Sequence, residues 1–159
     1  MQIENGKFYF ISNNFIQKYG EKYNLMANKE TGKKRPCYFC FRDKKDQDIV
    51  WFVPVSKQYE KFKEIHKYKK EKTGRDPLNF VFGEIKNIPA VFLIQNIFPT
   101  KEKYILEKYT NNNEAIEISK ATQYAIISKA EKIISLEEQK NIHIAFANLS
   151  EFKQELLSE

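Results

Sequence analysis

Two short apolar runs separated by a polar turn constrain the fold of this chain most strongly. Residues 36–41 (PCYFCF) and 49–55 (IVWFVPV) are rich in aromatic and β-branched side chains, and they flank the polar stretch 42–48 (RDKKDQD). This arrangement is typical of a β-hairpin. Residues 79–85 and 90–97 flank residues 86–89 in the same way. Consecutive hairpins build antiparallel sheets, so we expect such a sheet at the centre of the fold.

Helical patterns surround the hairpins. A strand over residues 7–12 leads into a short helix over 15–19, capped by Asn13 or Asn14. A longer helix over 57–72 is opened by Ser56, and its three-and-four spacing predicts one buried stripe. Further helices are predicted over 103–109, 120–140 and 151–157, the last capped by Asn148 or Ser150, with a loop over 110–113. We therefore expect an α+β fold that forms one domain over residues 1–159.

The longest apolar runs, residues 49–55 and 88–94, are seven residues each. A membrane-spanning helix needs roughly 18–20. The first residues, MQIENGKFYF, lack the basic and then hydrophobic pattern of a signal peptide. We therefore expect a cytoplasmic protein that has no membrane partner.

Cysteine and glycine patterns argue against a metal or a cofactor. Cys37 and Cys40 have C-x-x-C spacing, but His66 and His143 do not complete a four-ligand zinc site. The pair lies in a strand-like run, where residues three apart point to opposite faces. We interpret both as small core residues, with a redox or metal role as the alternative. The chain has no G-x-G-x-x-G, Walker A or H-E-x-x-H motif, so we expect no cofactor.

Positive charge is concentrated in the first half of the chain. The net charge is +6, with 24 Lys, 3 Arg, 13 Asn and 18 Ile, so A/T-rich codons account for part of the lysine excess. Residues 1–56 carry net +4, residues 57–75 net +5 and residues 76–159 net −3. Cations interleaved with aromatic rings are typical of single-stranded nucleic-acid binding. The predicted RNA-binding residues are Lys33, Lys34, Tyr38, Tyr59, Lys61, Lys63 and Lys67. The alternative is a solvated helix face with core aromatics.

The junction Pro54-Val55-Ser56-Lys57 is the strongest candidate for chemistry. A helix that begins at a serine presents unpaired backbone N–H groups, which favour a phosphate. Ser56 adds a hydroxyl and Lys57 a charge, and Arg35 would lie nearby across the hairpin. These groups suffice for metal-free RNA cleavage, in which the 2′-OH attacks and the protein stabilises the phosphorane. The alternative is a helix-capping serine beside a surface lysine.

His66 is a second catalytic candidate. An ordinary histidine pKa near 6.5 suits a general acid or base. The alternative is a half-buried structural histidine on the apolar side of the helix over 57–72. We assign no role to His143.

Five segments in consistent order resemble a known family. They are KFYFIS (7–12), RPCYFCF (35–41), WFVPVSK (51–57), VFGEI (81–85) and AVFLIQNIFP (90–99). Together they span almost the whole chain and resemble the ToxN/AbiQ-type endoribonuclease toxins of type III toxin–antitoxin systems, with the CptN branch the most similar.

The resemblance implies a compact, strongly bent antiparallel sheet surrounded by helices, similar to MazF/Kid toxins. It implies metal-independent cleavage of single-stranded RNA that leaves a 2′,3′-cyclic phosphate. The implied antitoxin is an RNA of repeated pseudoknots, which the toxin cuts from a precursor and which then inhibits it in a closed toxin–RNA assembly. Cellular RNAs are the implied substrates, and many such systems act in phage defence by abortive infection.

The family's site residues carry over to this sequence in part. Its proline–aliphatic–hydroxyl turn falls on Pro54-Val55-Ser56, which makes Ser56 the active-site hydroxyl. The catalytic lysine of the family commonly follows three positions later, where this chain has Tyr59, so the role falls on Lys57 or alternatively on Lys61. The family's basic residue before the second strand falls on or near Arg35, and His66 has no clear counterpart. The expected function is thus a metal-independent endoribonuclease. The alternatives are a non-catalytic single-stranded RNA or DNA-binding module and a protein-binding factor whose charge reflects codon usage.

Overall fold

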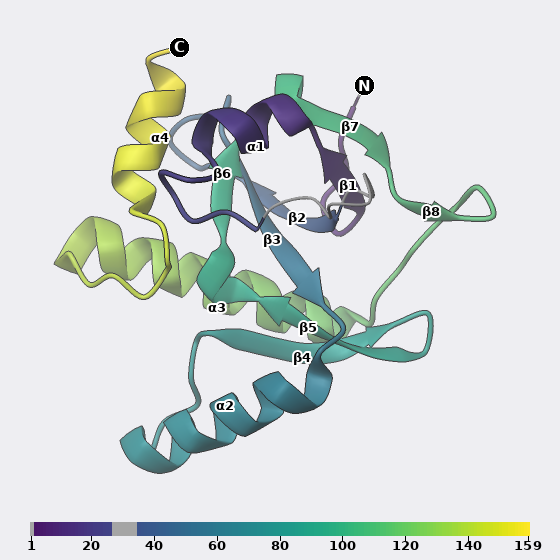
Figure 1. The fold of residues 1–159 in the computed structure, drawn as a ribbon, viewed down its shortest axis with the longest axis vertical. Coiled ribbons are helices and arrows are strands. Elements are labelled where there is room, and N and C mark those ends of the chain that lie inside the picture. The colour runs from purple at the N-terminus through teal and green to yellow at the C-terminus, as the bar shows by residue number, and fades with distance from the viewer. Residues whose placement is uncertain (1, 27–34) are drawn as a thin grey trace.

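An antiparallel sheet forms the centre of the molecule (Figure 1). The computed structural model describes residues 2–26 and 35–159. Its strands within these ranges are β1 (Phe8–Ile11), β2 (Pro36–Arg42), β3 (Val50–Ser56), β4 (Phe80–Ile85), β5 (Ile88–Leu93), β6 (Phe98–Thr100) and β7 (Ile105–Lys108). Their order is β4-β5-β3-β2-β1-β7, and β6 pairs with β3 outside this path. Both predicted hairpins, β2–β3 and β4–β5, are confirmed.

The sheet bends because β3 changes partners along its length. Its first half pairs with β6, with Val50 opposite Thr100 and Phe52 opposite Phe98. Its last residues pair with β5, with Val55 opposite Phe92 and Ser56 opposite Val91. Pro54 stands between the two pairings and lies opposite Cys37 of β2. The resulting bend carries Ser56 toward β4 and β5.

Four α-helices of the described residues pack around the sheet: α1 (Asn13–Tyr19), α2 (Tyr59–Thr73), α3 (Lys120–Lys140) and α4 (Leu149–Leu157). α2 packs on β4 and β5, and α4 lies beside α1 at the other end of the molecule (Figure 1). Ser12 caps α1 through a 3.3 Å bond from the Phe15 N–H, so the predicted cap at Asn13 or Asn14 is wrong. Asn148 caps α4, as one of the two alternatives predicted.

Aromatic side chains fill the core, and α4 packs against them. The ring of Phe152 stacks on Tyr23 at 4.0 Å and on Phe15 at 5.8 Å. Phe39 and Phe52 stack across β2 and β3 at 5.2 Å. Buried rings bring large apolar areas out of water, so this cluster dominates the stability of the fold.

Cys37 and Cys40 lie inside this core as free thiols. Burial raises the pKa of Cys37 to about 12 and also raises that of Cys40. A thiol is a weak nucleophile and a poor metal ligand unless it ionises. The interpretation of both as core residues is confirmed.

One predicted helix is instead a strand. The segment expected to be helical over 103–109 forms a 3₁₀ turn, η2 (Glu102–Tyr104), followed by β7. β7 pairs with β1, with Ile105 opposite Ile11 and Lys108 opposite Tyr9. These distant backbone bonds outweigh a weak local preference for helix. The first half of the loop predicted over 110–113 is instead a short strand, β8 (Thr110–Asn111), which pairs with β9 (Glu114–Ala115).

None of the helices in the described part of the chain combines the length and the hydropathy that crossing a bilayer requires.

Candidate active site

Ser56 is the last residue of β3 and does not open a helix. Its backbone pairs with Val91 of β5, which holds it in the strand. Its Oγ accepts a 3.1 Å hydrogen bond from the backbone N–H of Gln58, and α2 begins at Tyr59. The predicted opening of the helix at Ser56 is therefore wrong. Because Oγ accepts in this turn, the hydroxyl proton of the half-buried Ser56 is directed elsewhere and can be donated to a ligand.

Lys57 and Arg35 lie at the same end of the β2–β3 hairpin as Ser56. Lys57 is exposed and follows Ser56 directly. Arg35 directly precedes β2, and the pairing of β2 with β3 reaches Cys37 and Pro54 at this end of the hairpin. Arg35 and Pro54 also line one small cavity beneath α1. A hydroxyl, an ammonium and a guanidinium are thus carried at one end of the hairpin, while Lys33 and Lys34 lie outside the described residues.

The first turn of α2 adds backbone donors beside Ser56. The first N–H groups of any helix have no partner within it, and the side chain of the capping residue Gln58 makes no bond to them. The positive end of the helix dipole lies at the same point. The Tyr59 N–H donates to the Lys57 carbonyl at 2.8 Å, so it is not available to an anion, and the anion-binding role of this helix start stays a prediction.

His66 lies away from Ser56, in a network that ties α2 to α3. It is seven residues into α2 from Tyr59, which corresponds to about 10 Å along the axis. Its Nε2 is 3.1 Å from Asp76, whose other oxygen is 3.1 Å from Lys129 of α3. Burial lowers the pKa of His66, and the nearby Asp76 opposes this only in part. These contacts match the alternative of a half-buried structural histidine, and the structure does not bring His66 to Ser56.

The exposed surface of α2 carries more positive than negative charge. We call its exposed lysines Lys61, Lys63, Lys67, Lys70 and Lys72 the basic face; the exposed Glu60, Glu64 and Glu71 lie between them on the same helix. Within residues 2–26 and 35–159, none of these lysines lies within 4.0 Å of a carboxylate. Lysines elsewhere, such as Lys7, Lys22 and Lys108, do form such pairs. The basic face is therefore a favourable surface for a polyanion.

Two tyrosines of α2 accompany this charge. Tyr59 is half-buried, edge-on to Phe82 with 5.4 Å between ring centroids, and Lys63 Nζ lies 4.9 Å from the Phe82 centroid. Tyr68 is 64% exposed, with Lys72 Nζ 5.8 Å from its ring centroid. An exposed ring beside a cation can stack on a base of a single strand.

The prediction that Tyr38 binds RNA is wrong. Its side chain is 1% exposed and packs edge-on against Phe8 at 5.4 Å and Phe92 at 5.6 Å. The ring lies inside the sheet, where it cannot stack on a base. Phe39, the next residue of β2, is buried as well.

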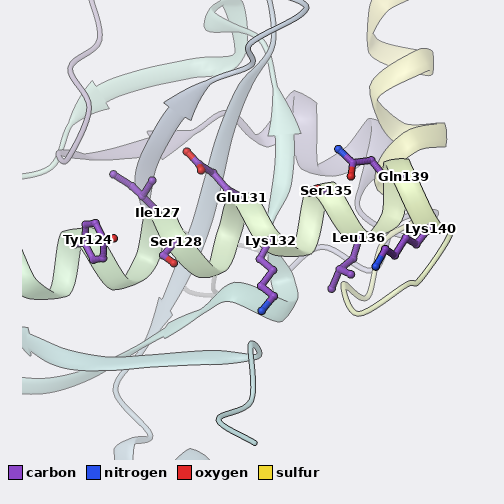
Figure 2. Close-up of a pocket in the computed structure, with 9 residues that line it drawn as sticks. All are labelled: Tyr124, Ile127, Ser128, Glu131, Lys132, Ser135, Leu136, Gln139 and Lys140. Atoms are coloured by element: carbon purple, nitrogen blue, oxygen red, sulfur yellow. The ribbon is translucent and has the colours of Figure 1, made fainter.

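An open hollow of about 630 Å³ that the sequence did not indicate lies along α3 from Tyr124 to Lys140, and the residues that line it all belong to this helix (Figure 2). Its lining mixes charged, polar and apolar side chains, and none of the predicted site residues contributes to it. The most exposed ring on this surface is Tyr124, at 77%. Residues 2–26 and 35–159 contain no group of three or more His, Cys, Asp or Glu that could hold a metal ion.

Comparison with known proteins identifies the fold. No protein-family model matches this chain, and no curated protein matches it in sequence. A bacterial type III toxin–antitoxin structure, in which a non-coding RNA pseudoknot selectively inhibits the toxin, superposes with a TM-score of 0.72. It is 14% identical to this chain, and 98% of each chain is covered.

Two further solved structures agree. AbiQ, a lactococcal anti-phage endoribonuclease belonging to the type III toxin–antitoxin system, has a TM-score of 0.72 at 12% identity, covering 98% of each chain. A protein of a bacterial antiviral system regulated by a processed non-coding RNA has a TM-score of 0.67 at 15% identity, covering 96% of this chain and 98% of its own.

These matches confirm the predicted α+β architecture. They establish that this chain has the fold of the type III toxins of the ToxN/AbiQ kind over nearly its whole length. The similarity to the CptN branch stays a prediction.

Proposed function

We propose that this chain is the toxin of a type III toxin–antitoxin system and that it acts as a metal-independent endoribonuclease. The observation that carries the proposal is the grouping of Ser56, Lys57 and Arg35 at one end of the β2–β3 hairpin, next to the basic face of α2. The shared fold with an endoribonuclease and with a toxin inhibited by RNA supports it. In this proposal residues 1–159 work as one catalytic domain in the cytoplasm.

The proposed reaction uses the substrate's own 2′-OH. The O2′–P bond forms and the P–O5′ bond breaks, so that the products carry a 2′,3′-cyclic phosphate and a 5′-OH. The 2′ oxygen loses a proton and the 5′ oxygen gains one. Ser56 orients the 2′-OH or the scissile phosphate, and the cations of Lys57 and Arg35 stabilise the charge on the phosphorane. Lys57 is preferred to Lys61 because it adjoins Ser56 in the chain, whereas Lys61 lies within the first turn of α2.

Single-stranded RNA is the proposed substrate class. The lysines of the basic face, with Lys33 and Lys34, hold the phosphate backbone, and Tyr59 and Tyr68 offer ring surface to unstacked bases. The proposed antitoxin is a repeated pseudoknot RNA that the toxin cuts from its precursor and that then blocks the site in a closed assembly. Phage defence is the proposed biological setting.

Incubating the purified protein with end-labelled RNA in excess EDTA tests this function. We expect cleavage that EDTA does not suppress and 3′ ends that resist poly(A) polymerase until the cyclic phosphate is removed. Protection of the RNA without cleavage would instead favour the non-catalytic binding module. RNA binding that is weak and insensitive to salt would favour the protein-binding factor, because phosphate contacts make affinity strongly salt-dependent.

A further inference from the structure

The carboxylate of Glu159 lies in a ring of five donors. Its Oε2 accepts hydrogen bonds from Tyr104 at 2.7 Å, from Lys18 at 3.1 Å and from Tyr19. Its Oε1 is 2.8 Å from Lys103 Nζ and 3.6 Å from Lys101 Nζ. We call the donors Lys18, Tyr19, Lys101, Lys103 and Tyr104 the anion cradle. The Glu159 side chain is only 9% exposed there.

The cradle is assembled by parts of the fold other than α4. Lys18 and Tyr19 belong to α1, and Lys103 and Tyr104 to η2. The rings of Tyr19 and Tyr104 pack against Phe15 at 5.3 Å and 5.1 Å, which fixes their hydroxyl groups. The N–H of Ser12 also donates to the Tyr104 carbonyl at 2.8 Å, tying η2 to the start of α1. The two phenol groups are therefore positioned by packing that does not involve Glu159, while the Lys18 and Lys103 side chains are 53% and 57% exposed.

The charge of the cradle exceeds that of its occupant. Three ammonium groups face one carboxylate, while Glu151 and Glu155 of α4 pair with Lys22 instead. A phosphate monoester carries up to two negative charges and more acceptor oxygens than a carboxylate. The two phenol and three ammonium donors of the anion cradle therefore match a phosphate monoester better than they match the Glu159 carboxylate.

Glu159 can leave without unfolding its helix. α4 ends at Leu157 with Ser158 as its cap, so Glu159 lies beyond the helix. The helix itself is held by the buried side chains of Phe152 and Leu156 and by the ion pair of Lys153 with Asp43. The Glu159 carboxylate is thus a removable occupant.

We propose that the anion cradle is a phosphate-binding site and that Glu159 is its built-in competitor. Its ligand is a phosphate group, either free or at the 5′ end of an RNA. The cradle lies beside β7, at the opposite end of the sheet order from β4 and β5, where Ser56 pairs. Binding there is separate from the proposed cleavage chemistry, so a failed test of either leaves the other standing.

Phosphate titration of Glu159→Ala at constant ionic strength tests the proposal. We expect inorganic phosphate to bind this variant at least tenfold more tightly than it binds the unmodified protein, by calorimetry. Glu155→Ala is the matched control, because it removes a carboxylate of α4 outside the cradle. Adding Lys103→Ala to Glu159→Ala should abolish the gain in phosphate affinity. Equal phosphate affinity in Glu159→Ala and Glu155→Ala would overturn the proposal.

A second arm separates the two sources of phosphate. The same RNA oligonucleotide is compared with a 5′-phosphate and with a 5′-hydroxyl, by fluorescence anisotropy with Glu159→Ala. Tighter binding of the 5′-phosphate RNA, lost when Lys103→Ala is added, supports an RNA end as the ligand. Equal affinities for the two RNAs, together with tight binding of inorganic phosphate, support the free ion. Glu159→Gln keeps the shape of the side chain and loses its charge. If Glu159→Ala unfolds, Glu159→Gln is the test variant. We expect the same gain in phosphate affinity, and a phosphate affinity equal to that of Glu155→Ala would overturn the proposal.

Discussion

The indole Nε1 of Trp51 donates a 2.9 Å hydrogen bond to Asp43 Oδ2 inside the core. The other oxygen of this carboxylate accepts the backbone N–H of Lys45 at 2.9 Å and of Asp46 at 3.0 Å, and it pairs with Lys153 of α4 at 3.1 Å. One buried acid therefore fixes the turn between β2 and β3 to the C-terminal helix. The opposite end of the same hairpin carries Arg35 and Ser56.

Replacing this acid should destabilise the fold strongly. Asp43→Asn keeps the shape but removes the charge that contacts Trp51 and Lys153, while Asp46 and Glu138 still pair with Lys153, so we expect a loss of about 1–3 kcal/mol. Urea denaturation measures the free energy of unfolding. Asp48→Asn, in the exposed part of the same turn, is the control and should change stability by no more than about 0.5 kcal/mol. Similar effects of the two variants would contradict the role of Asp43.

Because Asp43 and Lys153 titrate, the free energy of unfolding should depend on pH and be highest between their two pKa values. Burial raises the pKa of Asp43, but hydrogen bonds from Asp46 and Trp51 outweigh it and hold this pKa below its ordinary value. Burial lowers the pKa of Lys153, but Asp46 and Asp43 outweigh it and raise this pKa. The stability that Asp43 contributes is thus present above about pH 4 and is lost as the pH falls further. The stability that Lys153 contributes is present below about pH 10 and is lost above it. Melting temperatures across pH should show this plateau, with a shallower acid limb in Asp43→Asn. An unchanged acid limb would contradict the account.

His66 should make the protein less stable in mild acid. Because burial lowers its pKa in the folded state, the unfolded chain takes up a proton first as the pH falls below about 6.5. Stability should therefore decline from pH 7.5 to pH 5.5, and His66→Gln should weaken this decline. Urea midpoints at the two pH values measure this decline. An equal decline in His66→Gln and the unmodified protein would refute this role.

The basic face should account for much of the RNA affinity. The double variant Lys67→Ala/Lys70→Ala removes two exposed cations one turn apart. It should weaken binding and reduce the slope of log K against log salt by about 1.4, since each single-strand phosphate contact contributes about 0.7. Filter binding at several salt concentrations measures the slope. Lys132→Ala/Lys140→Ala on α3 is the matched control, and an equal effect of both double variants would show that net charge alone matters.

Local patterns predicted those parts of the fold whose stabilising contacts are close in sequence. The β2–β3 hairpin has seven-residue strands around a polar turn, as the alternation of apolar and polar segments predicted. α3 follows its periodic pattern from Lys120 to Lys140, as predicted. β7 was missed because its partner, β1, lies near the other end of the chain.

The sequence predicted which types of residue form the candidate site better than it predicted where those residues lie in the fold. Ser56 has the local signature of a helix cap, but its pairing with Val91 keeps it in β3. Tyr38 stands among basic residues in the sequence, and nothing local shows that both faces of β2 are covered. The network of His66, Asp76 and Lys129 joins three distant segments, so no local spacing could reveal it.

RNA cleavage by Ser56→Ala tests the central claim most directly. Single-turnover cleavage and RNA affinity are measured in EDTA for the unmodified protein, for Ser56→Ala and for Ser128→Ala, an exposed serine of α3. We expect Ser56→Ala to lose at least a hundredfold in cleavage rate while its RNA affinity changes less than threefold, and Ser128→Ala to match the unmodified protein. Cleavage by Ser56→Ala at the unmodified rate, with the same cyclic-phosphate products, would contradict the assignment of the active site to the end of β3.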